Sequence, residues 1–118
     1  MKITSVRTYL VDAGLREWLL VRIQTDEGVE GVGEGSLEGK SEAVAAAIGE
    51  LARYLVGQDA SRIRHHWEVM YRAFWKGGPV LSSALSAVEI ALWDIAGKAL
   101  GVPIYCLLGG AVRDRLRA

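Results

Sequence analysis

The chain has 118 residues, 51% hydrophobic and 24% charged, and its 14 basic residues balance its 14 acidic ones. These values are typical of one globular domain, and the zero net charge argues against a partner that is a nucleic acid or an anionic membrane surface. A single cysteine, Cys106, excludes an internal disulfide, and with no apparent signal peptide and no window approaching a membrane span we expect a soluble cytoplasmic protein.

The first third of the chain predicts an antiparallel meander of three strands. Residues 3–11 are rich in β-branched and aromatic side chains. Residues 18–25 form the second strand and end at Asp26-Glu27-Gly28, a sequence typical of a hairpin turn. Residues 29–34 form the third strand, where dense glycine indicates bends or a close approach of two backbones.

Two amphipathic helices are predicted next. The first covers residues 43–56, closes at Gly57 and has Ser41 in position to cap its start. The second begins after Asp59 or Ser61 and carries apolar residues at offsets of 4, 7, 8 and 11 on one face: Ile63, Trp67, Met70, Tyr71 and Phe74.

A third helix is predicted between Gly78-Pro79 and Gly101. Proline suits the first helical position, and a glycine followed by Pro103 ends a helix. Because this helix is apolar over most of its circumference, we expect neighbours on more than one side and place it at the centre of the domain. Strands followed by helices predict an α+β fold: a three-stranded antiparallel meander followed by a three-helix layer.

Several segments resemble one enzyme family. Ala84-Leu-Ser-Ala-Val-Glu-Ile-Ala-Leu-Trp-Asp-Ile-Ala-Gly-Lys98, followed after four residues by Pro103-Ile-Tyr-Cys-Leu-Leu-Gly109, is similar to the signature of the mandelate racemase and muconate lactonizing enzymes of the enolase superfamily. Met1-Lys-Ile-Thr and the hairpin at residues 25–34 resemble that family's N-terminal domain. Tyr71-Arg-Ala-Phe-Trp-Lys-Gly-Gly-Pro79 is most similar to the galactonate dehydratase type.

The resemblance implies a capping and substrate-specificity domain of a Mg²⁺-dependent acid-sugar dehydratase, a lyase. Such an enzyme removes the proton α to the carboxylate of a sugar acid such as galactonate. The family takes its Mg²⁺ ligands and its bases from a (β/α)₈ barrel, in cis or as a separate chain. Residues 1–111 are then the capping domain, and residues 112–118 begin the connection to a barrel missing from this sequence. We assign no catalytic and no metal-binding residue here, and we expect the chain alone to be inactive.

Two bends are implied to cover the mouth of the barrel, at residues 13–18 and 35–40. Their polar or amphipathic side chains, together with Lys76 at the start of the third helix, are the candidate substrate-binding residues: Arg16, Trp18, Ser36, Glu38, Lys40 and Lys76. Ordinary loop chemistry is an alternative explanation for each of them.

Other polar residues have structural explanations. His65 and His66 point about 100° apart on a helix, so they cannot share a metal, and we expect both on a solvated face. Asp94 and Lys98 form an i,i+4 ion pair. Glu89 is expected to bond a neighbouring backbone group or to contact the barrel.

Three other functions stay open. Only the segment Phe74-Trp-Lys-Gly-Gly-Pro79 favours a dehydratase over a racemase, epimerase or cycloisomerase of the same family. A stand-alone, non-catalytic assembly module would have the third helix's remaining apolar face either covered by another copy of the chain, as a homo-oligomer, or left exposed. A split enzyme would carry its barrel on a second polypeptide.

Overall fold

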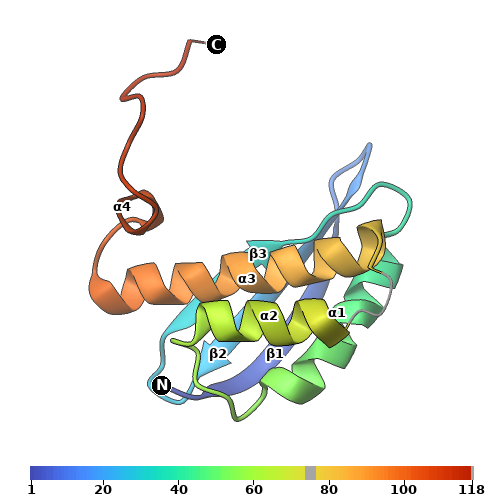
Figure 1. Ribbon diagram of the computed structural model, residues 1–118. Helices are drawn as coiled ribbons and strands as arrows, with labels where there is room; N and C mark the ends of the chain where they lie inside the picture. The colour runs from blue at the N-terminus through green and yellow to red at the C-terminus, as the bar shows by residue number, and fades with distance from the viewer. Residues whose placement is uncertain (74–76, 118) are drawn as a thin grey trace.

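The computed structural model describes residues 1–73 and 77–117 (Figure 1). The elements follow the predicted order, and they confirm the α+β fold with a three-stranded antiparallel sheet of order β1-β2-β3. Their bounds are β1 Ile3–Asp12, β2 Glu17–Thr25, β3 Glu30–Glu34, α1 Ser41–Leu55, α2 Ile63–Ala73, α3 Pro79–Leu100 and a short α4 Ile104–Leu107.

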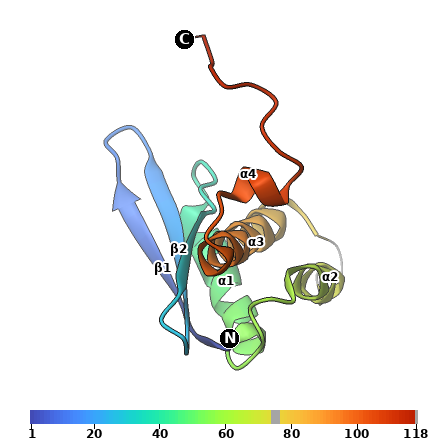
Figure 2. The same cartoon turned by 90° about the vertical axis from the view of Figure 1, so that its left-hand side faces the viewer.

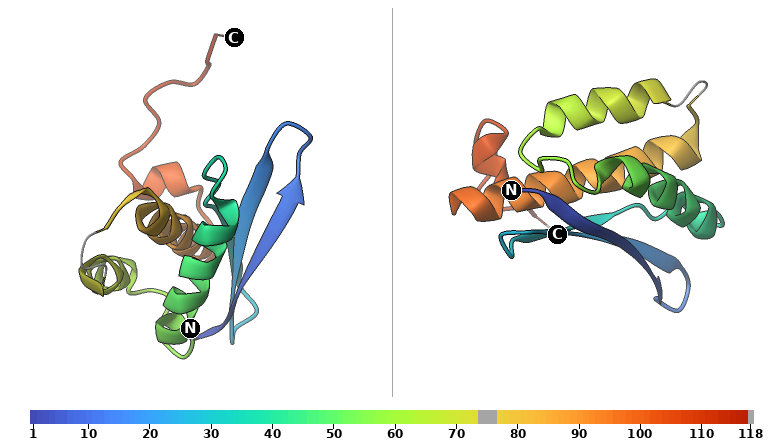
Figure 3. Two further views of the ribbon diagram at one scale, coloured as in Figure 1. Left: turned by 90° about the vertical axis from the view of Figure 1, so that its right-hand side faces the viewer. Right: turned by 90° about the horizontal axis from the view of Figure 1, so that it is seen from below.

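The sheet forms one layer and the three long helices lie on one side of it (Figure 3). The central strand β2 alternates, because Leu19, Val21 and Ile23 are fully buried under the helices while the residues between them face the other side. Period-2 burial of this kind is what a sheet covered on one face requires.

β3 and α3 touch backbone to backbone. A Cβ atom built on Gly31 would lie 2.0 Å from the carbonyl oxygen of Ala91, and one on Gly33 would lie 2.1 Å from that of Ala87. A side chain at either position would therefore collide with the backbone of α3, and only glycine allows this close approach. This confirms the close approach that the glycine-rich third strand indicated.

α3 is the central helix, as predicted. It begins with Pro79 in the first turn and ends at Gly101, whose φ of 67° is left-handed. It packs against β2, β3, α1, α2 and α4, and the residues that do so without exposed surface are spread around it: Ala84, Ala87, Val88, Ala91, Leu92 and Ile95.

The expectation that no segment approaches a membrane span was wrong. Among the residues that the structure describes, Pro79–Leu100 has the length and composition of one membrane-crossing helix. Its position explains the composition, since the sheet covers one side and α1 and α2 cover others (Figures 1 and 2). A helix surrounded by its own domain is apolar for the same reason as a helix surrounded by lipid.

The predicted ion pair on α3 also protects a sheet edge. Lys98 Nζ lies 2.8 Å from Asp94 Oδ2, which confirms the pair. The same carboxylate accepts a hydrogen bond from the Val32 amide at 2.9 Å, and Lys98 donates to the Glu30 carbonyl at 2.9 Å. Two backbone groups on the open side of β3 are thereby satisfied by the helix beside it, a device that discourages pairing with another chain.

Within residues 1–73 and 77–117, Glu89 bonds neither a backbone group nor a distant element. Its carboxylate accepts a long hydrogen bond of 3.4 Å from the indole nitrogen of Trp93, one turn further along α3.

His66 corrects the expectation of a solvated histidine pair. His65 is exposed, but His66 has no exposed surface. Its Nε2 lies 2.7 Å from the Asp59 carbonyl oxygen and its Nδ1 lies 2.8 Å from the Tyr54 hydroxyl. Because a carbonyl only accepts, Nε2 donates to Asp59, and the ring joins α1, α2 and the loop between them. Burial also raises the pKa of Tyr54.

The orientation of α2 explains this error. The helix buries Ile63, His66 and Met70, whereas Trp67 is half-buried and stacks on the exposed Tyr71 with ring centroids 4.8 Å apart. The predicted face therefore holds for Ile63 and Met70 but not for Tyr71. Phe74 lies outside the described residues.

Ser41 is not the cap of α1. The helix begins with Ser41 itself, Lys40 precedes it, and no side chain in the described part of the chain caps the start. The Ser41 hydroxyl instead lies 3.4 Å from the Leu37 carbonyl oxygen. Glu42 stands in the first turn, where its negative charge interacts favourably with the positive end of the helix dipole.

Candidate functional site

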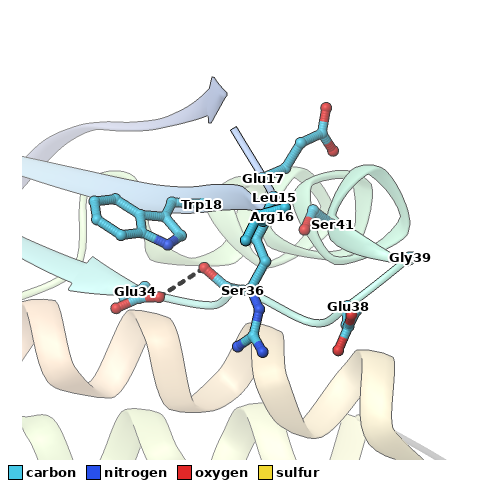
Figure 4. A pocket seen from close by; sticks show the side chains of 9 residues that line it. All are labelled: Leu15, Arg16, Glu17, Trp18, Glu34, Ser36, Glu38, Gly39 and Ser41. Atoms are coloured by element: carbon cyan, nitrogen blue, oxygen red, sulfur yellow. Dashed lines mark hydrogen bonds between the residues drawn. The ribbon is translucent and has the colours of Figure 1, made fainter. Parts of the chain in front are cut away.

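Two bends lie side by side at one end of the sheet (Figure 1). The first joins β1 to β2 and is closed by a hydrogen bond from the Ala13 amide to the Arg16 carbonyl, 2.9 Å. The second, residues 35–40, joins β3 to α1. Between the bends is a hollow of about 440 Å³, a volume within the range of small-molecule sites. Its lining residues are Leu15, Arg16, Glu17, Trp18, Glu34, Ser36, Glu38, Gly39 and Ser41 (Figure 4).

The structure brings four of the six predicted substrate-binding residues together. Arg16 and Trp18 come from the first bend and the start of β2, and Ser36 and Glu38 come from the second bend. Lys40 is exposed immediately before α1 and is not among the lining residues. Lys76 lies outside the described residues.

Sequence reasoning missed five lining residues: Leu15, Glu17, Glu34, Gly39 and Ser41. The signal for Glu34 was strand register. It pairs with Leu20 across the sheet, which places it on the same face as Trp18, two residues from Leu20. Leu15 is 99% exposed at the tip of the first bend. An exposed leucine at the tip of a hairpin is typical of a residue that contacts a partner or a ligand.

Ser36 ties the two bends together at their bases. Its hydroxyl oxygen accepts a hydrogen bond from the Leu19 amide at 3.0 Å and donates its proton to Glu34 Oε1 at 2.7 Å. The Gly35 amide donates to the Leu19 carbonyl at 2.9 Å. The ladder between β2 and β3 therefore continues one residue past the end of β3, with a side-chain hydroxyl taking the place of a backbone acceptor.

The hollow combines one cation, three carboxylates, hydroxyls and an indole. Arg16 runs past Ser36, and Trp18, which is 51% exposed, presents its ring at the other side (Figure 4). The carboxylates belong to Glu17, Glu34 and Glu38. Such groups donate and accept hydrogen bonds in several directions beside an apolar ring, which suits a ligand rich in hydroxyls.

The carboxylates around the hollow do not form a metal-binding cluster among the residues that the structure describes. Within residues 1–73 and 77–117, no group of three or more His, Cys, Asp or Glu side chains is placed to hold a metal ion, whereas Mg²⁺ requires an octahedral set of oxygen ligands. The described lining contains neither lysine nor histidine. The groups that do line the hollow can bind and orient a ligand through hydrogen bonds and through contact with the indole ring.

Comparison with known proteins gives one family. Residues 5–109 match the model of the mandelate racemase / muconate lactonizing enzyme N-terminal domain. The chain is 57% identical over 118 residues to the D-galactonate dehydratase of Verminephrobacter eiseniae and 52% identical over 119 residues to that of Pectobacterium atrosepticum. These alignments cover 99% and 100% of this chain but 30% of each relative, so the chain spans about a third of their length.

Solved structures share the fold. A protein from Mesorhizobium loti, provisionally assigned as a dehydratase, is 48% identical with a TM-score of 0.94, and the match covers 100% of this chain and 33% of that one. An enolase from Pantoea ananatis with D-gluconate and Mg bound is 42% identical with a TM-score of 0.90, over 96% of this chain and 28% of that one.

Proposed function

Because the chain belongs to the mandelate racemase and muconate lactonizing enzyme family, whose N-terminal domain its residues 5–109 match, we propose that it is the capping domain of a Mg²⁺-dependent sugar-acid dehydratase of the galactonate dehydratase type. The relatives named above as D-galactonate dehydratases support this choice of reaction within the family. The whole enzyme is a lyase: it breaks the C–H bond α to the carboxylate, passes that proton to a base, and expels the β-hydroxyl as water.

The proposal divides the work between two domains. Residues 1–111 form the cap, and residues 112–118 begin the connection to a (β/α)₈ barrel, in cis or on a separate chain. In this proposal the barrel would supply the Mg²⁺ ligands and the base; within residues 1–73 and 77–117 no group of three or more His, Cys, Asp or Glu side chains is placed to hold a metal ion. The chain alone is then inactive. We propose the cytoplasm as its compartment because Cys106 is exposed and unpaired.

The observation that carries the proposal is the pair of bends with its hollow. Arg16, Trp18 and Glu38 line this hollow. In the proposal Arg16 and Glu38 bond the distal hydroxyls of a sugar acid and the Trp18 ring covers its carbon chain. When the bends close over the barrel they exclude water, which strengthens the electrostatic interactions beneath them. Lys40 and Lys76 stay predictions as further contacts.

A chimera tests the proposal. Residues 1–111 of this chain are joined to the remaining part of the Verminephrobacter relative, and dehydration of D-galactonate is measured with Mg²⁺. We expect turnover by the chimera and none by the 118-residue chain alone. Arg16→Ala in the chimera should raise KM by about tenfold, the loss of one charged hydrogen bond. Turnover by the chain alone, or a folded chimera inactive on every sugar acid, contradicts the proposal.

A further inference from the structure

We infer that Ser36 is a positioning residue that sets the spacing of the two bends and hence the shape of the hollow between them. The inference rests on the proposed capping function, because it assigns Ser36 to the geometry of the binding surface and not to direct contact with a substrate.

One hydroxyl serves both sides of the hollow. The Ser36 hydroxyl accepts a hydrogen bond from the amide of Leu19. Because Leu19 directly follows Trp18 in the chain, this bond fixes the base of the first bend. The same hydroxyl donates to the carboxylate of Glu34, which is the last residue of β3 and lines the hollow. Because the hydroxyl has only one proton, these two bonds assign its direction: it accepts from the backbone and donates to the acid.

The segment around Ser36 cannot adjust toward the core. Gly35 is buried, and a Cβ on it would lie 2.9 Å from the Ala87 Cβ and 3.4 Å from Val44 Cγ1. The second bend is therefore pressed against α3 and α1, and its position relative to β2 depends on the bonds that residues 35 and 36 make to Leu19.

The far end of the second bend is held as well. The Lys40 amide donates to the Leu37 carbonyl at 2.8 Å, and the Val44 amide donates to the Lys40 carbonyl at 3.0 Å, inside the first turn of α1. The bend is thus a short, stiff segment anchored to the helix at one end and to β2 through Ser36 at the other.

The first bend has little other support. The arm formed by the end of β1, the first bend and the start of β2 extends beyond the helices (Figures 1 and 2). Its side chains are exposed on both faces: Tyr9, Leu10, Val11, Leu15 and Trp18. Removing the Ser36 hydroxyl therefore loosens the connection between the arm and the second bend, which then depends on the bond from the Gly35 amide to the Leu19 carbonyl.

Amide hydrogen exchange of the 118-residue chain, followed by NMR, tests the tether directly. In Ser36→Ala the Leu19 amide should exchange at least about tenfold faster, with smaller increases at residues 37–39, because the lost bond no longer protects it. Ser36→Thr keeps the hydroxyl and should restore protection, and Ser36→Val, which differs from it by a methyl in place of the hydroxyl, should not. Ser82→Ala removes an exposed serine hydroxyl from α3 and should leave the Leu19 amide unchanged.

Kinetics of the chimera supply the functional readout. Ser36→Ala and Ser36→Val should raise KM for D-galactonate about tenfold with kcat within about twofold, and Ser36→Thr should recover the original KM. If Ser36→Ala does not fold, the Thr and Val pair gives the same comparison. Unchanged Leu19 exchange in Ser36→Ala overturns the inference, as does faster exchange with unchanged KM in an active chimera. A chimera that never turns over refutes the proposed function, while the exchange data still decide whether Ser36 ties the bends together.

Discussion

Replacing Gly33 by alanine should remove much of the domain's stability, because the added methyl meets main-chain atoms. The new Cβ would lie 2.1 Å from the Ala87 carbonyl oxygen and 3.1 Å from both the Ala87 carbonyl carbon and the Ala91 amide nitrogen. Relief requires β3 to retreat from α3 by roughly an ångström, since a helix backbone cannot rotate away as a side chain can. Overpacking a core costs about 1–3 kcal/mol when side chains adjust. Here the strand and the helix are in contact through their backbones, so we expect Gly33→Ala to lower the free energy of unfolding by about 3 kcal/mol or more. That is a large part of the roughly 5–15 kcal/mol that stabilises a whole domain.

Gly49→Ala is the matched control. Gly49 is exposed in α1, nothing lies within 4 Å of its added Cβ, and its φ is not left-handed. Alanine should stabilise the helix there by about 0.5–1 kcal/mol. Urea unfolding followed by circular dichroism measures both variants. The two substitutions should have opposite signs, and a Gly33→Ala chain within about 0.5 kcal/mol of the original would refute the backbone contact between β3 and α3.

Three further predictions concern the scaffold around the site. His66→Ala should lower the free energy of unfolding by about 2–4 kcal/mol because it opens a cavity and removes the partner of the Tyr54 hydroxyl and of the Asp59 carbonyl, whereas His65→Ala should change it by less than about 0.5 kcal/mol. Equal effects in urea unfolding would contradict the buried position of His66. Asp94→Leu removes the acceptor of the Val32 amide, and this amide should therefore exchange hydrogen about tenfold faster, as measured by NMR. Unchanged protection would show that α3 does not protect the edge of β3. The backbone amide of Ser61 lowers the pKa of Asp59 below its ordinary 3.8, so this carboxylate contributes stability that is present above that value and lost as pH falls through the lower folded value. Asp59→Asn should therefore be less stable than the original chain at neutral pH, with the difference shrinking in acid; a constant difference between pH values of about 6 and 2 would argue against the effect.

The sequence was a good guide where a signal is local. Pro79 and Gly101 bound α3 because one suits a first turn and the other adopts a left-handed cap, and both effects depend on adjacent residues alone. The apolar circumference of that helix likewise predicted its central place. Glycines in β3 predicted a close approach, although the partner, at Ala87 and Ala91, became visible only in three dimensions.

Prediction failed where a side chain's environment is made by a distant segment. In α2 the aromatic residues favoured a buried face through Trp67 and Tyr71, but His66 is the buried residue because Tyr54, twelve residues earlier, offers a hydroxyl to its ring. No period in the sequence encodes that partner. Ser41 has the right side chain for a cap, but the helix starts one residue too early for it to act as one.

The candidate site shows the same division. The two bends and the residues Arg16, Trp18, Ser36 and Glu38 followed from family resemblance, and the structure brings all four to one hollow. Glu34 was missed because its place depends on the pairing of Leu20 with residue 34, and strand composition alone does not determine that register.

Hydrogen exchange of the chimera with and without saturating D-galactonate and Mg²⁺ tests most directly whether this domain covers the substrate. The account predicts new protection at residues 13–18 and 35–40 and none in the loop at residues 56–62, which lies outside the hollow. Turnover accompanied by unchanged exchange at both bends would contradict it.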